Sequence, residues 1–459
     1  MYNYASNKAS SIHAFALKYG DILKSYNIKS LLNKAEISES YITEISKMKT
    51  LHELIKNDVY GICFYEDVKF SPVDISSASK ESVQLGLLTA MRTKPFLLLA
   101  GISGTGKSRI VKQLAYESCP DIDNLREDKT SPGNYQLIEV KPNWHDSTEV
   151  IGYESEIGDR HYVLTPFVRF LVKAMRYETK CPFFVCMDEM NLAPVEQYFA
   201  EFLSVLESRK VDGTRITSEP LIKAEIFKRY EEQLRDELGL PSSEGGYNDD
   251  YEKLKEKGLR LPSNLIVVGT VNMDETTHQF SRKVIDRAMT IEMNIADDKE
   301  PFEAFFEGED TMHYYDNPQP KELYLPKVVQ AGEALALLKT EDAEYVKTNV
   351  PDLLCSLNKA LDGTPFKIAY RVQNELVLYF HALREEEQHR DDSAADLLNQ
   401  AMDAILMMKV LPRIEGDEDL LEKPLAKLAE FTAAYPQASK KITEMQERLQ
   451  GAHFTSFWP

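Results

Sequence analysis

The chain has few cysteines and no long hydrophobic run. Five cysteines are scattered among 459 residues, and an odd, scattered set fits reduced core thiols better than a disulfide framework or a metal site. No apolar run approaches the length of a membrane span, and the first residues lack the charged-then-apolar pattern of a signal peptide. We therefore expect a cytoplasmic protein with no part in a membrane.

Basic residues are also in deficit. Lys and Arg number 54 against 74 Asp and Glu, which gives a formal net charge of −20. This balance argues against a chain that binds polyanions over its whole surface, although a local basic patch stays compatible with it. The hydrophobic fraction of 43% and the charged fraction of 28% are those of an ordinary globular protein. The length allows two or three domains.

A glycine-rich loop lies between an apolar strand and a helix predicted over 109–116. It fits the pattern G-x-x-x-x-G-K-S, in which successive backbone N–H groups point at one anion, the lysine meets the β- and γ-phosphates, and the serine hydroxyl meets Mg²⁺. The alternative is a simple glycine-serine turn, which would not require the strand before the loop or the helix after it. We expect the nucleotide to be bound by Gly101, Ile102, Ser103, Gly104, Thr105, Gly106, Lys107, Ser108 and Arg109.

Two further apolar strands end in polar side chains. Asp188 and Glu189 follow one strand, and Asn272 follows the other. Parallel strands bring their carboxyl ends to one edge of a sheet, where the phosphate loop also lies. We expect Asp188 and Ser108 to hold Mg²⁺, partly through water, and Glu189 to act as general base on the attacking water. Asn272 would orient that water or the γ-phosphate, and the alternative is a turn residue with no part in the chemistry.

Three arginines are candidates for contacts with nucleotide. Arg287 and Arg282 lie between the fourth and fifth predicted strands, where an arginine reaches the nucleotide of a neighbouring subunit and neutralises charge on its γ-phosphate. We favour Arg287 for this role in trans, and a local ion pair with Asp286 or another carboxylate is the alternative. Arg371 lies at the start of a later helix, from which it would fold back over the nucleotide. The alternative is an ordinary surface arginine.

Helical and strand patterns alternate over 79–294. Apolar strands separated by helices indicate an α/β fold with a parallel sheet covered on both faces. A surface insertion at about 210–261 interrupts the alternation, with a charged helix over 223–238 and a polar loop over 242–250. The strands are predicted over 96–100, 135–140, 183–187, 265–271 and 289–293.

Helical periodicity marks both ends of the chain. Residues 1–78 form a small, mostly helical region by this pattern, and residues 295–459 form an α-helical lid and C-terminal domain. The later helices are predicted over 322–338, 344–361, 373–387, 394–408 and 420–435.

Together these motifs resemble an AAA+ P-loop NTPase over about residues 80–380. Within that superfamily, the segments Asp188-Glu-Met-Asn, Leu206-Glu207, Gly269-Thr-Val-Asn272 and Tyr370-Arg371 resemble the McrB-like branch, the motor subunit of modification-dependent restriction systems. The resemblance implies a five-stranded sheet with a helical lid and a hexameric ring with nucleotide between subunits. It also implies hydrolysis of GTP or ATP, and a separate McrC-like nuclease subunit with which the ring acts on DNA in phage defence.

Three functions are compatible with these motifs. The first is a ring motor that drives a nuclease partner along DNA, because the nucleotide elements are complete and the chain has no nuclease constellation of its own. The second is a chaperone of the MoxR or dynein-related kind, which remodels a protein client. The third is a nucleotide-gated binding module whose slow hydrolysis serves as a timer.

Overall fold

A five-stranded parallel sheet forms the centre of the structure. The computed structural model describes residues 78–458 apart from 123–124, 214, 274–279 and 294–311. The strands lie in the order β11-β1-β10-β5-β2, and every neighbouring pair is parallel. Their bounds are β1 Phe96–Gly101, β2 Tyr135–Glu139, β5 Phe183–Asp188, β10 Leu265–Asn272 and β11 Met289–Glu292. Each of the five predicted strands is present, which confirms the α/β fold.

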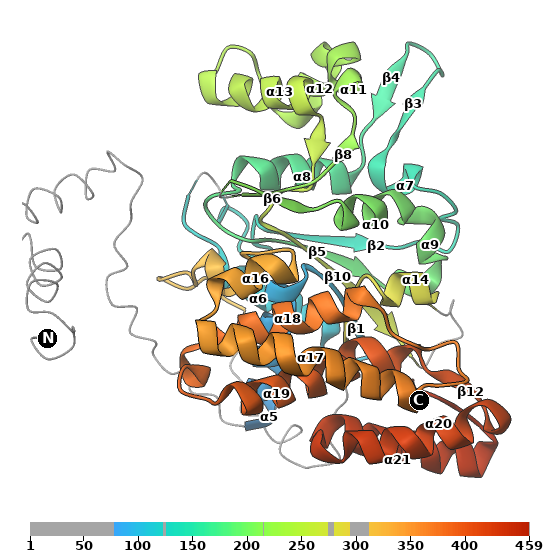
Figure 1. Cartoon of the computed structure of the whole chain (residues 1–459). Helices are drawn as coiled ribbons and strands as arrows, with labels where there is room; N and C mark the ends of the chain where they lie inside the picture. The colour runs from blue at the N-terminus through green and yellow to red at the C-terminus, as the bar shows by residue number, and fades with distance from the viewer. Residues whose placement is uncertain (1–77, 123–124, 214, 274–279, 294–311, 459) are drawn as a thin grey trace, which may run out of the picture. The chain divides into compact units, whose positions relative to one another are not determined.

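Helices cover both faces of the sheet (Figure 1). Successive residues of β1 are buried on opposite faces, Leu97 and Leu99 in one cluster and Phe96 and Leu98 in the other, as the two-residue period of a strand requires. The first face packs against α5 (Ala78–Thr93), α6 (Lys107–Ser118) and the C-terminal helices. The second packs against α8 (Pro166–Arg176), α9 (Val195–Tyr198) and α10 (Ala200–Glu207).

Short elements connect these layers. A four-residue helix, α7 (Thr148–Ile151), precedes an antiparallel hairpin of β3 (Tyr153–Ser155) and β4 (His161–Val163). A second hairpin joins β6 (Lys210–Asp212) to β7 (Arg215–Thr217) at the start of the insertion. The 3₁₀ helix η2 (Met190–Leu192) follows β5, and α14 (Arg282–Ile285) precedes β11.

The insertion is a helical unit on a two-stranded stem. Strand β8 (Pro220–Ile222) pairs with β9 (Leu259–Arg260), and between them lie α11 (Ala224–Arg229), α12 (Glu231–Leu238) and α13 (Gly245–Lys257). The predicted polar loop over 242–250 is wrong from Gly245 onward, because α13 begins there. Tyr251 is buried there, and its hydroxyl donates to the carbonyl oxygen of Phe227 at 2.9 Å, which fastens α13 to α11.

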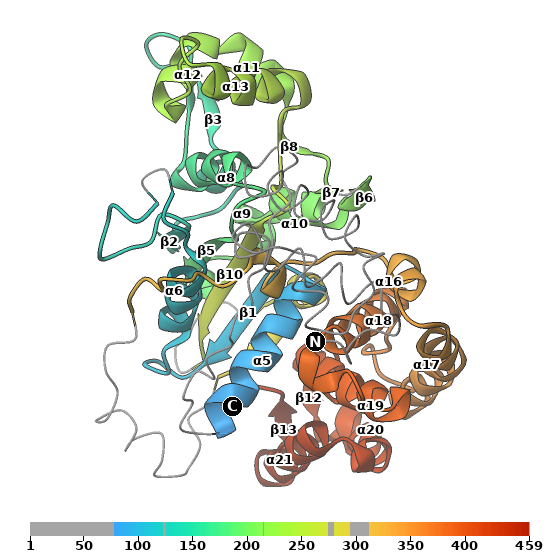
Figure 2. The ribbon, with the colours of Figure 1, turned by 90° about the vertical axis from the view of Figure 1, so that its left-hand side faces the viewer.

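The C-terminal part is helical, as predicted, and packs on the same face as α5 (Figure 2). The helix predicted over 322–338 is wrong over its first half, because residues 324–330 are not helical and only α16 (Ala331–Leu337) forms there. The sequence prediction missed the last helix of this part, whose apolar residues Ala438, Ile442, Met445 and Leu449 do have helical spacing. It also missed a small antiparallel sheet of β12 (Glu415–Asp417) and β13 (Phe454–Ser456). The α-helices are α16 Ala331–Leu337, α17 Thr340–Ala360, α18 Tyr370–Arg384, α19 Ala394–Ile405, α20 Glu418–Phe431 and α21 Pro436–Ala452. The remaining turns are η3 Lys321–Leu323, η4 Glu387–His389, the π-helix η5 Leu406–Val410, η6 Leu411–Arg413 and η7 Thr432–Ala434.

Among the described helices, none is both long and apolar enough to cross a bilayer. The predicted N-terminal region, residues 1–78, lies outside the described residues except for its last position. The boundary predicted at 294/295 falls in a range that is likewise not described, so it stays a prediction.

Candidate active site

The phosphate loop lies where β1 ends and α6 begins. Gly104 and Gly106 have φ of 82° and 80°, in the left-handed region that glycine enters without steric cost. Gly101 lies opposite Asn272 in the register of β1 and β10, and its carbonyl accepts the N–H of Met273 at 3.2 Å. The loop is thereby fixed to the neighbouring strand, and its two left-handed glycines turn the backbone toward the N-terminus of α6, whose first N–H groups attract an anion.

The lysine of the loop is held over the loop itself. Lys107 is 5% exposed, and its Nζ donates to the carbonyl oxygens of Gly101 at 3.0 Å and Ile102 at 2.7 Å. The ammonium group therefore lies where the loop would receive phosphate oxygens. Arg109 is exposed on the next turn of α6 and lines a surface hollow with Ser108.

Asp188 receives two hydroxyl donors. Its Oδ1 accepts the Ser108 hydroxyl at 2.6 Å and the Thr270 hydroxyl at 2.7 Å. Asp188 is the last residue of β5 and lies opposite Glu139 of β2, so it stands at the edge of the sheet where the strands end. The structure thus brings Ser108 and Asp188 side by side, as the sequence predicts, and adds a threonine that the sequence prediction missed.

Glu189 has an unusual backbone conformation. Its φ and ψ are 51° and 49°, a left-handed conformation that costs a residue with a Cβ about 1–2 kcal/mol. Two contacts hold it there: its N–H donates to Thr270 Oγ1 at 3.0 Å, and its Oε1 accepts the Asn272 amide at 3.1 Å. Strained residues of this kind cluster at active sites because the surrounding structure fixes their side chains.

Ser108 and Asp188 provide oxygen ligands of the kind that Mg²⁺ prefers. Over the described residues, no group of three or more His, Cys, Asp or Glu could enclose a metal ion. Mg²⁺ usually takes one or two protein oxygens and completes its octahedron with water and substrate phosphates. A hydroxyl and a carboxylate 2.6 Å apart beside a phosphate loop therefore suit an ion that arrives with a nucleotide.

Arg287 lies at the opposite edge of the sheet. It lies two residues before the start of β11 at Met289, which lies opposite Leu97 near the start of β1. Four strand residues separate Leu97 from Gly101, which is about 13 Å at 3.3 Å per residue, so Arg287 cannot reach the phosphate loop of its own chain. Its side chain makes no hydrogen bond or ion pair with a described residue, so the local pair with Asp286 is not formed.

The other two arginines lie at this edge as well. The Arg282 guanidinium carbon stands 4.6 Å from the ring centre of Phe366. Arg371 does not fold back over the phosphate loop: its guanidinium pairs with Glu207 at 3.0 Å and with Asp286 at 3.8 Å. Burial raises the pKa of Glu207, but Lys94 and then Arg371 and Arg287 outweigh it and hold that pKa below its ordinary value.

Two family models match the ends of the chain. Residues 328–454 match the model of a domain of unknown function, DUF8727, and residues 1–58 match that of an HTH-like domain. No curated protein matches. A solved structure of a candidate ATPase from Cytophaga hutchinsonii is 14% identical, with 66% of this chain and 74% of that chain covered and a TM-score of 0.34. Neither family model reaches residues 101–292, so the assignment of the site rests on its own geometry.

Proposed function

We propose that this chain hydrolyses a nucleoside triphosphate, GTP or ATP, with Mg²⁺. The observation that carries the proposal is one connected set of hydrogen bonds that runs from Ser108 through Asp188 and Thr270 to Glu189 and Asn272. The phosphate loop and Lys107 bind the phosphates, and Ser108 and Asp188 hold the ion that neutralises their charge. Such a site belongs to a P-loop NTPase of the AAA+ kind.

Glu189 takes the proton of the attacking water in this proposal. Its Oε1 already accepts one hydrogen bond from Asn272, which fixes the direction of the carboxylate. A base must lie within hydrogen-bond reach of the water that it deprotonates, and its position matters before its basicity. The left-handed backbone at Glu189 turns the side chain away from the path of β5 and toward Asn272 of β10.

Arg287 completes the site of a neighbouring subunit. Because it lies at the edge where the strands begin, it reaches a nucleotide only when that edge faces the phosphate loop of another copy. Head-to-tail contacts of this kind form a ring when the rotation between neighbouring subunits closes. The proposed assembly is a homo-oligomeric, hexameric ring in which each active site lies between two chains.

The cellular role proposed for this ring is that of a McrB-like motor in restriction and phage defence, in the cytoplasm, with a McrC-like nuclease subunit. The match of residues 1–58 to an HTH-like domain supports DNA as the polymer along which the complex moves, because helix-turn-helix units place a helix in the major groove. A MoxR or dynein-related chaperone would use the same nucleotide site on a protein client.

Hydrolysis of GTP and ATP by two site variants tests the nucleotide assignment. Lys107→Ala is expected to lose nucleotide binding. Glu189→Gln is expected to bind nucleotide but to hydrolyse it at least about a hundredfold more slowly than wild type. Lys347→Ala is the control, because that exposed lysine pairs with Glu344 on the surface of α17. The assignment fails when both site variants hydrolyse at the wild-type rate.

A partner assay separates the two cellular roles. Double-stranded DNA added to the wild-type protein should raise its rate of hydrolysis when the chain is a DNA motor. An unchanged rate over a range of DNA lengths, together with retained Glu189-dependent hydrolysis, would favour a remodeller of protein clients.

A further inference from the structure

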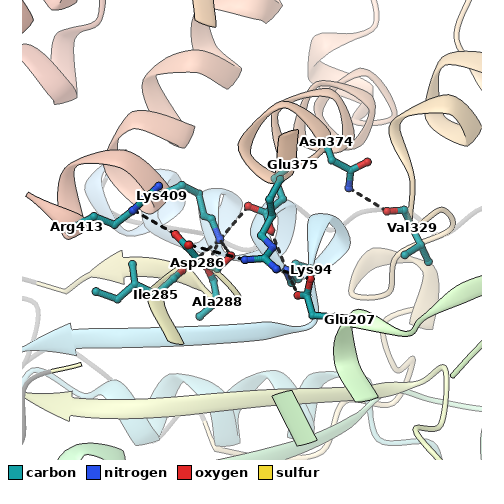
Figure 3. Close-up of polar contacts among 11 residues, drawn as sticks. Lys94, Glu207, Ile285, Asp286, Ala288, Val329, Asn374, Glu375, Lys409 and Arg413 are labelled. Carbon is teal, nitrogen blue, oxygen red and sulfur yellow. Dashed lines mark hydrogen bonds and ion pairs between the residues drawn. The ribbon is translucent and has the colours of Figure 1, made fainter. Parts of the chain in front are cut away.

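A chain of buried charges joins the C-terminal helices to the turn that carries Arg287 (Figure 3). Its centre is Lys409, which is 1% exposed and lies on the π-helix η5. Lys409 pairs with Glu375 of α18 at 2.9 Å, and the Glu375 side chain is 2% exposed. Single π-helical turns inside longer helices are rare and occur often at functional positions.

The Lys409 ammonium group holds the backbone on both sides of Arg287. Its Nζ donates to the carbonyl oxygens of Ile285 at 3.2 Å, Asp286 at 2.7 Å and Ala288 at 2.8 Å. An ammonium group has three donors, and the three carbonyl oxygens take them, so Glu375 faces this group as the partner of an ion pair. The turn is therefore fixed by a charge from the C-terminal helices and not by its own four-residue helix α14 alone.

Further contacts tie the same turn to the start of β1. The other oxygen of Glu375 pairs with Lys94 at 2.9 Å, and Lys94 also pairs with Glu207 at 3.1 Å. On the far side, Arg413 of η6 pairs with Asp286 at 3.2 Å. Buried ion pairs are often no more stabilising than apolar residues of the same size. A gain in stability alone therefore does not explain this network. A role in fixing the position of the backbone turn 285–288 does explain it.

We propose that Lys409 is a positioning residue for Arg287. It fixes the turn 285–288 against the C-terminal helices, so that a movement of these helices displaces Arg287 from the nucleotide of the neighbouring subunit. This inference rests on the proposed function of Arg287 in trans. The C-terminal helices of one chain thereby govern hydrolysis in the next chain.

Mixed assemblies test this inference. Lys409→Met removes the charge, and the double variant K409M/E375Q also removes the carboxylate that would otherwise lose a partner. Each should hydrolyse nucleotide about tenfold to a hundredfold more slowly than wild type, because a displacement of about 1 Å costs that much. Each should regain activity when mixed with excess Lys107→Ala subunits, which are themselves inactive but supply an intact Arg287 to the intact phosphate loops.

Three reference variants make the outcome decisive. Arg287→Ala should show the same loss and the same rescue, and Lys409→Arg should retain most activity because it keeps the positive charge. Lys441→Met removes a different buried lysine, which pairs with Glu292 at the far end of β11, and should show no rescue by Lys107→Ala subunits. Thermal melting confirms that each variant is folded.

The two possible failures are distinguishable. If Arg287→Ala is rescued but folded K409M/E375Q is not, Lys409 does not act through Arg287 and the inference is overturned. If Arg287→Ala itself is not rescued while wild type hydrolyses nucleotide, the trans role of Arg287 in the proposed function is wrong.

Discussion

Burial and neighbouring charges act on the protonation of Lys409 in opposite directions. Burial lowers its pKa from 10.5 to about 8, whereas Glu375 from α18 and Asp286 from the Arg287 turn favour the charged form, and Lys94 before β1 disfavours it. Glu375 in turn is buried, yet Lys409 and Lys94 hold its pKa below the ordinary value. The carboxylate therefore stays ionised, and the lysine is the group that titrates at mildly alkaline pH.

Hydrolysis should fall as the pH rises through about 8. Loss of the Lys409 proton removes one donor and the charge from the contacts that fix the Arg287 turn. We expect the rate with saturating nucleotide to decline between about pH 7 and about pH 9, and we expect Lys409→Arg to move that decline to higher pH because arginine keeps its proton. A wild-type rate that stays constant over this range would contradict the expected titration.

The free energy of unfolding should not fall with the hydrolysis rate as the pH rises. The folded chain releases this proton near pH 8, whereas the unfolded chain keeps it until about 10.5. Between these values the unfolded state binds more protons at this position, so the contribution of Lys409 to the free energy of unfolding rises with pH. Urea unfolding midpoints measured beside the rates separate lost positioning from simple unfolding.

At the scale of elements, the ends of β5 and β10 act as one unit. The hydroxyl of Thr270 in β10 donates to Asp188 and accepts the N–H of Glu189, so it fixes two residues at the end of β5. Thr270 is 2% exposed, and an unsatisfied buried polar group costs about 1–3 kcal/mol. The strand pairing alone ends at Gly269 opposite Met187 and does not hold Glu189.

Thr270→Val should therefore slow hydrolysis and leave nucleotide binding nearly intact. Valine keeps the shape of the side chain but removes the hydroxyl, so the Glu189 N–H loses its acceptor and the carboxylate loses its fixed direction. We expect the rate constant for hydrolysis to fall about tenfold or more while nucleotide affinity, measured by titration, changes little.

The matched control for this substitution is Thr290→Val. Thr290 lies on β11 and is also 2% exposed, and its hydroxyl has no hydrogen-bond partner among the described residues. This control should hydrolyse at the wild-type rate. A Thr270→Val protein as active as the control would remove Thr270 from the positioning of Glu189.

The sequence predicted the elements of this site better than their connections. All five strands are where the sequence predicts them. Three of them also end in a marked residue: β1 in Gly101, β5 in Asp188 and β10 in Asn272. Thr270 lies 82 positions from Asp188, and Lys409 lies 123 positions from Asp286. A local sequence pattern cannot predict contacts between residues so far apart in the chain. A threonine inside an otherwise apolar strand is nevertheless a signal that could have pointed to Thr270.

The arginines also show that local sequence predicts a position along the chain better than a contact between layers. The sequence placed Arg287 before the fifth strand, and the structure shows that this puts it at the edge where the parallel strands begin. The place of Arg371 depended on how the C-terminal helices pack against the sheet, and they bring it to Glu207 and Asp286. Packing of one layer on another is set by many side chains together, so a helix start alone could not reveal it.

At the scale of the whole molecule, net charge opposes the proposed ring. Each chain carries −20, and each bound nucleotide adds negative charge, so neighbouring subunits repel one another through solvent. The screening length falls from about 30 Å at 0.01 M salt to about 8 Å at 0.15 M. Contacts across an interface, such as that of Arg287 with phosphate, act over shorter distances and are screened less.

Assembly should therefore become easier as salt rises from about 0.01 M to about 0.15 M. The Glu189→Gln protein with nucleotide and Mg²⁺ is the sample to use, because slow hydrolysis preserves the nucleotide during the measurement. Sedimentation or native mass should show the concentration for half-assembly falling over this range, and Arg287→Ala should assemble less well at every salt concentration. Assembly that weakens steadily with salt would mean that attraction between oppositely charged surfaces, and not repulsion between acidic subunits, governs the interface.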